Sequence, residues 1–313
     1  MTPSGSAPPS GPHVSPAGVS GADSAPGSAA PDSERLEEGA ALRRRVCDPP
    51  PSPVVLSIPH AGTATSGFEG ELAPSLDVRC DADLLVDTLY QVGAGETGGA
   101  WRGPWVIAKL SRFVCDMNRD ADDVSRLAVP EHPRPGNADG RGFVWTVTTD
   151  GSPALARPLA LASWEARRAV HAAYHGAITE ALAAARRRFG FAVLLDGHSM
   201  PSVGRTGHKD PGRSRAEVVP GDRDGTSCAP ALSRLVRGHF EAQGYAVAMN
   251  DPYRGGFITT HHGRPADGIH AIQVELRRDL YMDETTFAPK PDGFRRLQSA
   301  LAGLLATLDR FQP

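Results

Sequence analysis

The stretch Ala192-Val-Leu-Leu-Asp-Gly-His-Ser199 constrains the fold more than any other part of this 313-residue chain. Its apolar run shows no alternation, which predicts a strand buried on both faces, as in the middle of an α/β sheet. Open α/β sheets carry their chemistry just beyond the carboxyl ends of such strands. His198 is therefore a candidate metal ligand or catalytic base, with Asp196 placed to orient its imidazole. The alternative is a structural histidine that caps a loop.

Further predicted strands and helices alternate along the chain. Short apolar runs predict strands at 54–58, 105–110, 245–249 and 271–276. Apolar periodicity predicts helices at 77–90, 163–189, 229–243 and 293–311. Stretches rich in Gly, Pro and polar residues predict long loops at 121–160 and 200–226. The alternation favours an α/β fold with a central mixed, largely parallel sheet flanked by helices.

The N-terminal part of the chain differs in composition from the rest. Residues 1–48 begin with a run of Pro, Gly, Ser and Ala that predicts a disordered tail, with room for a short helix over 34–45. The prolines between Pro49 and Pro53 then break the chain. We expect a single catalytic domain over 49–313.

Charge and cysteine usage exclude several classes of function. A formal net charge of −3 with 22% charged residues indicates neither a nucleic-acid partner nor a membrane surface. No apolar run is long enough to span a bilayer, and the first residues do not predict a signal peptide. The four cysteines are scattered, which suits a reducing cytoplasm and predicts no thiolate zinc cluster. We expect a cytoplasmic protein with a small-molecule ligand; its oligomeric state is left open.

Polar groups follow three of the predicted strands. His60 lies after 54–58, His198 ends the opening stretch, and Glu275 ends 271–276. Two imidazoles and one carboxylate make a zinc site with an open position for water, although other divalent ions accept the same donors. Asp81 and Asp83 lie near the start of the helix predicted at 77–90, with Asp87 one turn further on, and these three carboxylates are more than one cap requires. An unligated carboxylate near bound zinc would accept the proton of an activated water.

Arginines near the predicted loops offer carboxylate recognition. Asn118 and Arg119 place an amide beside a planar guanidinium, which suits a substrate carboxylate. A surface ion pair with a neighbouring aspartate is the alternative for Arg119. Arg254 precedes two glycines that permit close approach of a ligand to the backbone. Together with a metal, these groups describe hydrolysis of an amide whose substrate carries an acid. His171 and His175 lie one helical turn apart without an HExxH motif, so we expect a surface residue and a structural one.

Several motifs stand in a fixed order along the chain. They are Ser57-Ile-Pro-His60-Ala-Gly62, Asp81-Ala-Asp83, Ser111-Arg112, Asn118-Arg119, Asp196-Gly-His198-Ser199, Asp224-Gly-Thr-Ser-Cys228, His261-His-Gly-Arg264-Pro265 and Gln273-Val-Glu275-Leu276. In this order they resemble the N-formylglutamate amidohydrolase family. The resemblance extends from about residue 52 to the C-terminus.

The resemblance implies a phosphorylase/hydrolase-like fold, similar to that of zinc carboxypeptidases. It implies Zn²⁺ as cofactor, with His60 and His198 as ligands. The carboxypeptidase pattern has a glutamate where this chain has Thr63, so the third ligand must come from elsewhere; Asp83 is preferred over Asp81. The remaining roles follow the same similarity: Glu275 as general base, and substrate binding by Arg112, Asn118, Arg119, Arg254 and Arg264.

The activity implied is hydrolysis of N-formyl-L-glutamate to formate and L-glutamate, a step of histidine degradation. One departure concerns specificity: residues 212–224 are rich in charge where the family predicts an asparagine-containing stretch. Hydrolysis of a different N-formyl or N-acyl amino acid is therefore the second hypothesis. A non-catalytic binder of an amino-acid derivative is the third, and the full set of His60, His198 and Glu275 argues against it.

Overall fold

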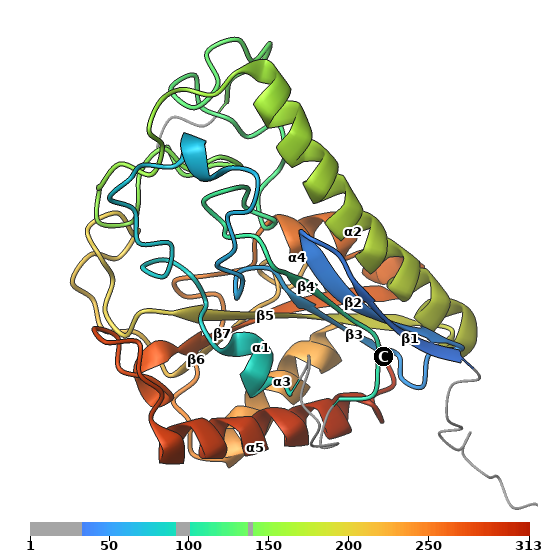
Figure 1. Ribbon diagram of the computed structural model, residues 1–313. Helices are drawn as coiled ribbons and strands as arrows, with labels where there is room; N and C mark the ends of the chain where they lie inside the picture. Colours follow the sequence, from blue (N-terminus) through green and yellow to red (C-terminus); the bar gives the residue numbers. More distant parts are fainter. Residues whose placement is uncertain (1–32, 92–100, 137–139) are drawn as a thin grey trace, which may run out of the picture.

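A mixed seven-stranded sheet forms the centre of the computed structural model, which describes residues 33–91, 101–136 and 140–313 (Figure 1). The strand order is β1-β2-β4-β3-β5-β7-β6. The pairs that join β4, β3, β5 and β7 are parallel, and the outer pairs are antiparallel. The mixed α/β class predicted from the sequence is confirmed. The strands are β1 Ser33–Glu38, β2 Leu42–Asp48, β3 Val54–Ile58, β4 Trp105–Ala108, β5 Ala192–Met200, β6 Val218–Gly221 and β7 Ile269–Arg277.

Helices cover both faces of the sheet. In Figure 1, α2 runs along one face, whereas α1, α3 and α5 lie on the other. None of the helices in the described ranges is both long and apolar enough to cross a membrane. The α-helices are α1 Val86–Leu89, α2 Leu161–Phe189, α3 Pro230–Ala242, α4 Phe257–His262 and α5 Pro291–Leu308. Short 3₁₀ turns are η1 Glu69–Glu71, η2 Pro265–Asp267 and η3 Arg278–Leu280.

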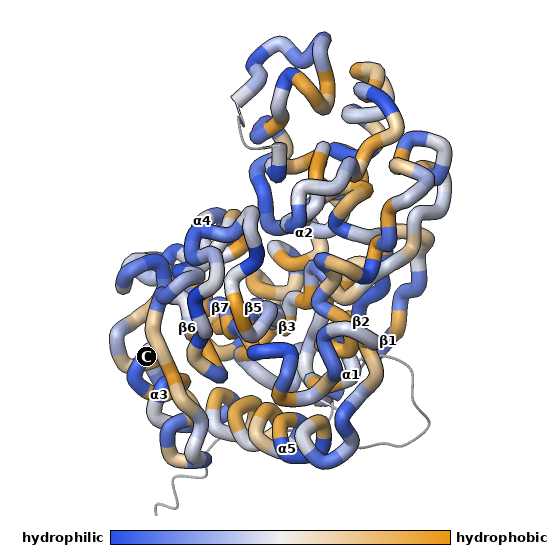
Figure 2. Tube along the Cα trace, turned by 90° about the vertical axis from the view of Figure 1, so that its left-hand side faces the viewer, coloured by the Kyte–Doolittle hydropathy of each residue, from blue (hydrophilic) through white to orange (hydrophobic). Residues whose placement is uncertain are grey.

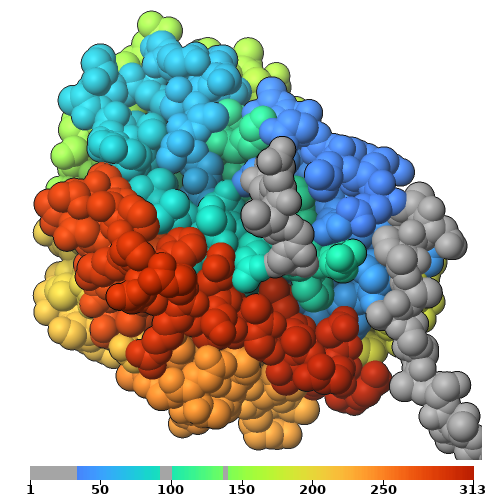
Figure 3. All heavy atoms as spheres, turned by 60° about the horizontal axis from the view of Figure 1, so that its bottom comes forward, coloured from blue at the N-terminus to red at the C-terminus, as the bar shows by residue number. Residues whose placement is uncertain are grey.

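The sheet separates two apolar cores, because successive side chains of a strand point to opposite faces. Val54 and Leu56 of β3 pack in the core beneath α3 and α5, whereas Val55 packs in the core beneath α2. The sequence of α5 alternates apolar and polar residues along the helix (Figure 2). Its apolar side is buried, and its outer side forms a band next to α3 on the molecular surface (Figure 3).

The first described residues belong to the sheet, so the expected tail is wrong for residues 33–48. The segment 34–45, where a short helix had room to form, is the β1–β2 hairpin, and β2 pairs with β4. Glu37 lies opposite Arg44 across this hairpin, and the two side chains form an ion pair of 2.6 Å. The charged side chains that made a helix plausible from the sequence thus form pairs between the two strands. Residues 1–32, expected to be disordered, lie outside the described residues.

Three further predictions differ from the structure near the site. The helix expected at 77–90 is present only as α1, because the amide of Asp83 donates to the carbonyl of His60 (2.9 Å) and Leu85 adopts a left-handed conformation. The strand expected at 245–249 is a single bridge between Val247 and Val218. The edge strand β6 lies instead inside the loop expected at 200–226. The short α4 was not predicted.

Candidate functional site

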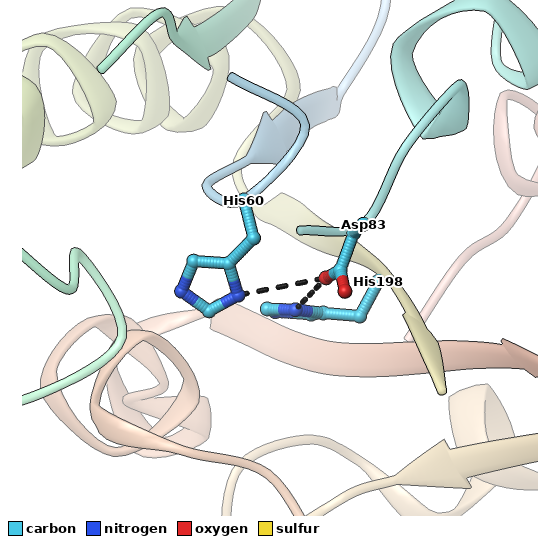
Figure 4. A group of neighbouring side chains, drawn as sticks. All are labelled: His60, Asp83 and His198. Carbon is cyan, nitrogen blue, oxygen red and sulfur yellow. Dashed lines mark hydrogen bonds and ion pairs between the residues drawn. The ribbon is translucent and has the colours of Figure 1, made fainter. Parts of the chain in front are cut away.

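Three buried side chains converge above the carboxyl ends of the central strands. His60 follows β3, His198 lies on β5, and Asp83 comes from the loop before α1. Oδ2 of Asp83 lies 3.1 Å from Nδ1 of His198 and 3.5 Å from Nδ1 of His60 (Figure 4). One ligand atom from each residue fits within 4.8 Å of the others, and each residue is only 2% exposed. The structure thus brings together the three residues expected as metal ligands.

A second carboxylate anchors each imidazole from behind. Asp116 Oδ1 lies 2.7 Å from Nε2 of His60, and Asp196 Oδ2 lies 2.8 Å from Nε2 of His198. Both aspartates are fully buried. A carboxylate bound to Nε2 leaves Nδ1 as the acceptor nitrogen and fixes the orientation of the ring. The orienting role expected for Asp196 is therefore present, and Asp116 plays the same role for His60.

These residues fit a bound cation. Nδ1 of His60 is buried and has no hydrogen-bond partner, although it faces Asp83. Burial opposes ionisation of Asp83, but contacts with His198 and His60 outweigh it and hold the pKa of Asp83 well below its usual range. Burial also disfavours a charged His198, but Asp196 outweighs it and raises the pKa of His198. The site therefore favours a positive charge between His198 and Asp83. Two imidazole nitrogens and a carboxylate are a donor set typical of zinc.

Asp81 and Asp83 have different partners. The Asp81 carboxylate accepts hydrogen bonds from the amide and the hydroxyl of Thr149, and it pairs with Arg205 at 3.3 Å. Asp83 instead accepts a hydrogen bond of 3.0 Å from Arg278, which leaves its other oxygen toward the histidines. The geometry places Asp83, and not Asp81, in the three-residue group. Asp81 fixes the loop that carries Thr149.

Glu275 lies directly beside His198 on the neighbouring strand. The two residues are paired in the register of β5 and β7, so their backbones are separated by the spacing of adjacent strands, about 4.8 Å. Gln273 donates a hydrogen bond of 2.9 Å to the Glu275 carboxylate. Burial raises the pKa of Glu275 to about 7, since the nearby cationic groups only partly offset the loss of solvation. A carboxylate with a pKa near neutrality suits proton transfer.

One cavity of about 290 Å³ opens onto this group. It is lined by His60, Asp83, His198 and Glu275, and also by the expected substrate-binding residues Arg112, Asn118, Arg119 and Arg254. Asn118 donates to Gln273 (3.3 Å) and accepts from the amide of Ile258 (2.9 Å). Arg112 is held by Asp116 at 2.8 Å. The group His60–Asp83–His198, called the metal-type group below, therefore shares one cavity with a buried carboxylate and several guanidiniums. This combination of side chains would suit hydrolysis of an acidic amide.

Of the arginines expected to bind the substrate, Arg264 lies outside the site cavity, and Arg254 already forms an ion pair. Arg264 donates to the carbonyl of His261 and lies 3.4 Å from Asp267. It lines a different hollow of about 540 Å³ with Arg186 and Arg187, away from the residues of the site. Arg254 lines the site cavity, but its exposed guanidinium pairs with Asp224 at 3.0 Å.

Sequence reasoning missed several residues that shape the cavity. Arg278, Gln273, Arg223 and Tyr253 line it, and none of them was given a role at the site. Arg278 and Gln273 flank Glu275 on β7 or just after it, and this proximity was the available signal. The expectation for His171 was also wrong, because this residue is buried and contacts the carbonyl of Arg119 (2.9 Å).

The structural role expected for His175 agrees with its contacts. Its Nε2 lies 2.9 Å from the carbonyl of Met117, and its Nδ1 lies 2.9 Å from Nε2 of His262. Together with His171, it fixes the backbone on both sides of Asn118.

Comparisons with known proteins agree with one another. The family model for N-formylglutamate amidohydrolase matches residues 52–282. An N-formylglutamate deformylase of Pseudomonas aeruginosa is 33% identical over 262 residues, covering 82% of this chain and 92% of that protein. The Pseudomonas putida N-formylglutamate deformylase is also 33% identical, with the same coverage of both chains.

A solved structure shows the same similarity. The crystal structure of N-formylglutamate amidohydrolase from Ralstonia eutropha superposes with a TM-score of 0.73 at 32% identity, covering 90% of this chain and 95% of that one. A gene product of Agrobacterium tumefaciens shares the fold at 23% identity, with a TM-score of 0.55 and coverage of 86% and 95%.

Proposed function

The chain belongs to the N-formylglutamate amidohydrolase family, and we propose that it hydrolyses N-formyl-L-glutamate to formate and L-glutamate. It is a hydrolase that acts on an amide C–N bond. One observation carries the choice of mechanism: the group His60–Asp83–His198 and the buried base candidate Glu275 line the same cavity. In the same proposal, the enzyme acts in histidine degradation and is located in the cytoplasm.

A divalent cation, with zinc as the first choice, is the cofactor of this proposal. His60 and His198 would hold it through Nδ1, and Asp83 through Oδ2, because these atoms already face one another. Bound there, it supplies Lewis acidity that polarises a carbonyl oxygen and lowers the pKa of water. The likeness to zinc carboxypeptidases is part of the same proposal, since it concerns this donor set and its neighbouring glutamate.

Glu275 is the general base. Its carboxylate accepts a proton from the water that attacks the formyl carbon, and it then gives this proton to the amide nitrogen as the C–N bond breaks. The hydroxyl group from water stays in formate, and the amine leaves as L-glutamate. The position of Glu275 next to His198 and its raised pKa support both transfers.

Asn118 and Arg119 orient the substrate in this proposal. Arg119 lines the cavity and bears a guanidinium with fork geometry, which matches a carboxylate. His171 and His175 hold the backbone carbonyls on either side of Asn118, so this segment is fixed before substrate binds. Preorganisation of this kind favours both binding and catalysis.

The experiment combines metal analysis with measurement of formate release. Purified protein should contain about one divalent ion per chain and release formate from N-formyl-L-glutamate. Chelation should abolish turnover, and addition of zinc should restore it. A panel of N-formyl and N-acetyl amino acids tests the second hypothesis, which equal turnover of a non-acidic substrate would favour. A zinc-loaded protein that releases no formate would refute the proposal.

A further inference from the structure

We propose that Arg223 is the residue that selects an acidic side chain in the substrate, by binding its distal carboxylate. The inference rests on the proposed function and deepens it, because it assigns the second of the two carboxylates of an N-formyl dicarboxylic amino acid. Neither Arg254 nor Arg264 has this role in our assignment. The reasons lie in the turn that carries Arg223, in the glycines beneath it and in the charges of the cavity.

The turn that follows β6 places Arg223 in the lining of the cavity. Arg223 adopts a left-handed conformation with φ of 57°, which costs a non-glycine residue about 1–2 kcal/mol. Asp222 holds the turn, since its carboxylate accepts from the amide of Gly225 (2.9 Å) and from the side chain of Asn250 (2.8 Å). Backbone strain that is held in place by its surroundings is typical of ligand-binding positions.

Two adjacent glycines make room for the side chains that line this wall. A Cβ atom on Gly255 would lie 3.1 Å from Cδ of Arg223, and one on Gly256 would lie 2.4 Å from Oδ1 of Asn118. Arg223 also donates to the carbonyl of Gly255 (3.2 Å). Arg223 and Asn118 therefore pack against neighbouring residues of the same backbone segment. Asn118, Arg119 and Arg223 all line the same cavity.

Charge pairing separates Arg223 from three other arginines of the cavity. Three lining arginines already pair with aspartates: Arg112, Arg254 and Arg278. Within the described ranges, Arg119 and Arg223 have no carboxylate partner, and both are only half-buried. The two acidic neighbours of Arg223 are engaged elsewhere, Asp222 with Ser233 and Asp224 with Arg254. Two guanidiniums that form no ion pair within the described ranges match a substrate with two carboxylates.

The charged stretch at 212–224 thus acquires a role. Arg223 lies within this stretch, whose charge departs from the family pattern and motivates the hypothesis of a different N-acyl substrate. In the structure, the same residue favours an acidic substrate, because a guanidinium left without a partner in a cavity recognises a carboxylate and rejects a neutral amide.

The test compares N-formyl-L-glutamate with N-formyl-L-glutamine, which has nearly the same shape but no side-chain charge. For Arg223→Gln, kcat/KM should fall about 10- to 100-fold for the acid and change little for the amide. Arg223→Lys should retain part of the preference, since it keeps the charge but loses the fork geometry. Arg119→Gln should lower kcat/KM for both substrates, because both carry the α-carboxylate. Arg213→Gln is the matched control, an exposed arginine that pairs with Asp251 outside the cavity.

The outcomes separate this inference from the proposed function. The inference fails if wild-type enzyme turns over both substrates equally, or if Arg223→Gln slows both to the same extent. It also fails if Arg254→Gln or Lys209→Gln, and not Arg223→Gln, removes the preference for the acid. Absence of formate from either substrate with zinc-loaded wild type would overturn the proposed function, and this inference with it. Metal content and urea midpoints of every variant exclude loss of folding as the cause.

Discussion

Arg278 donates a hydrogen bond of 3.0 Å to Oδ1 of Asp83, and this contact determines which oxygen of the aspartate faces the histidines. The guanidinium is buried and is itself held by the hydroxyl of Ser199 at 3.1 Å. Removal of such a partner behind a metal ligand typically lowers metal affinity 10- to 100-fold. We expect this loss for Arg278→Met, measured by competition with a chromophoric chelator.

The neighbouring Arg277 provides the control for that measurement. It is more exposed and pairs with Asp279 at 2.7 Å, outside the cavity. Arg277→Met should leave metal affinity within about threefold of the wild type. Equal affinities of Arg278→Met and the wild type would show that Asp83 needs no support from Arg278.

Substitution of the two aspartates before α1 distinguishes a metal ligand from a structural residue. Asp83→Asn should purify without metal, because an amide is a poor replacement for a carboxylate ligand. Asp81→Asn should keep its metal but lose about 1–3 kcal/mol of unfolding free energy, since the contacts with Thr149 and Arg205 weaken. Metal analysis and urea unfolding of both variants test this. Retention of metal by Asp83→Asn together with its loss from Asp81→Asn would reverse the assignment.

The central strands could be predicted because each contains a short apolar run without alternation, as in β3 and β5, whose residues are buried. The β1–β2 hairpin could not be predicted, because its Glu and Arg side chains suit a helix equally well. Only the pairing of the two strands brings Glu37 next to Arg44. The short length of α1 also results from a tertiary contact. The amide of Asp83 bonds to the carbonyl of His60, and no local pattern in the sequence indicates this contact.

In the candidate site too, residues with a local sequence signal could be predicted, whereas residues that depend on tertiary contacts could not. His60, His198 and Glu275 could be singled out because each follows or ends a predicted strand, and strand ends of a parallel sheet meet. The roles of Arg278 and Arg223 could not be predicted, because the first depends on a tertiary contact with Asp83 and the second on a left-handed turn after β6. Arg264 lies in a recognisable motif, yet the chain turns away from the cavity before that residue.

Glu275→Gln tests the base directly. The amide keeps the size of the side chain but accepts no proton, so kcat should fall about 10²- to 10⁴-fold. Metal content and KM should change little, because Glu275 lies beside the metal-type group and is not one of its three members. Formate release and metal analysis on the same preparation give the result. A kcat within tenfold of the wild type would exclude Glu275 as the base.

The pair His175–His262 makes stability depend on pH. Burial lowers the pKa of His175 to about 2 and that of His262 to about 3. The contacts require a neutral His175, because its Nε2 donates to Met117 while its Nδ1 accepts from His262. Burial keeps His262 neutral as well. The unfolded chain binds protons below its ordinary histidine pKa, about 6.5, whereas the folded chain does not. Stability therefore rises with pH in this range and is lost as pH falls below about 6.5.

Urea unfolding at pH 7.5 and pH 5 measures this contribution. Each histidine should cost the wild type about 2 kcal/mol of unfolding free energy between these two values. The double variant His175→Gln/His262→Gln does not titrate at these positions, so its loss should be smaller by up to about 4 kcal/mol. Both proteins are compared without metal, so that titration of the metal-type group contributes equally to each. The same loss in both proteins would mean that the two histidines are not held neutral by the fold.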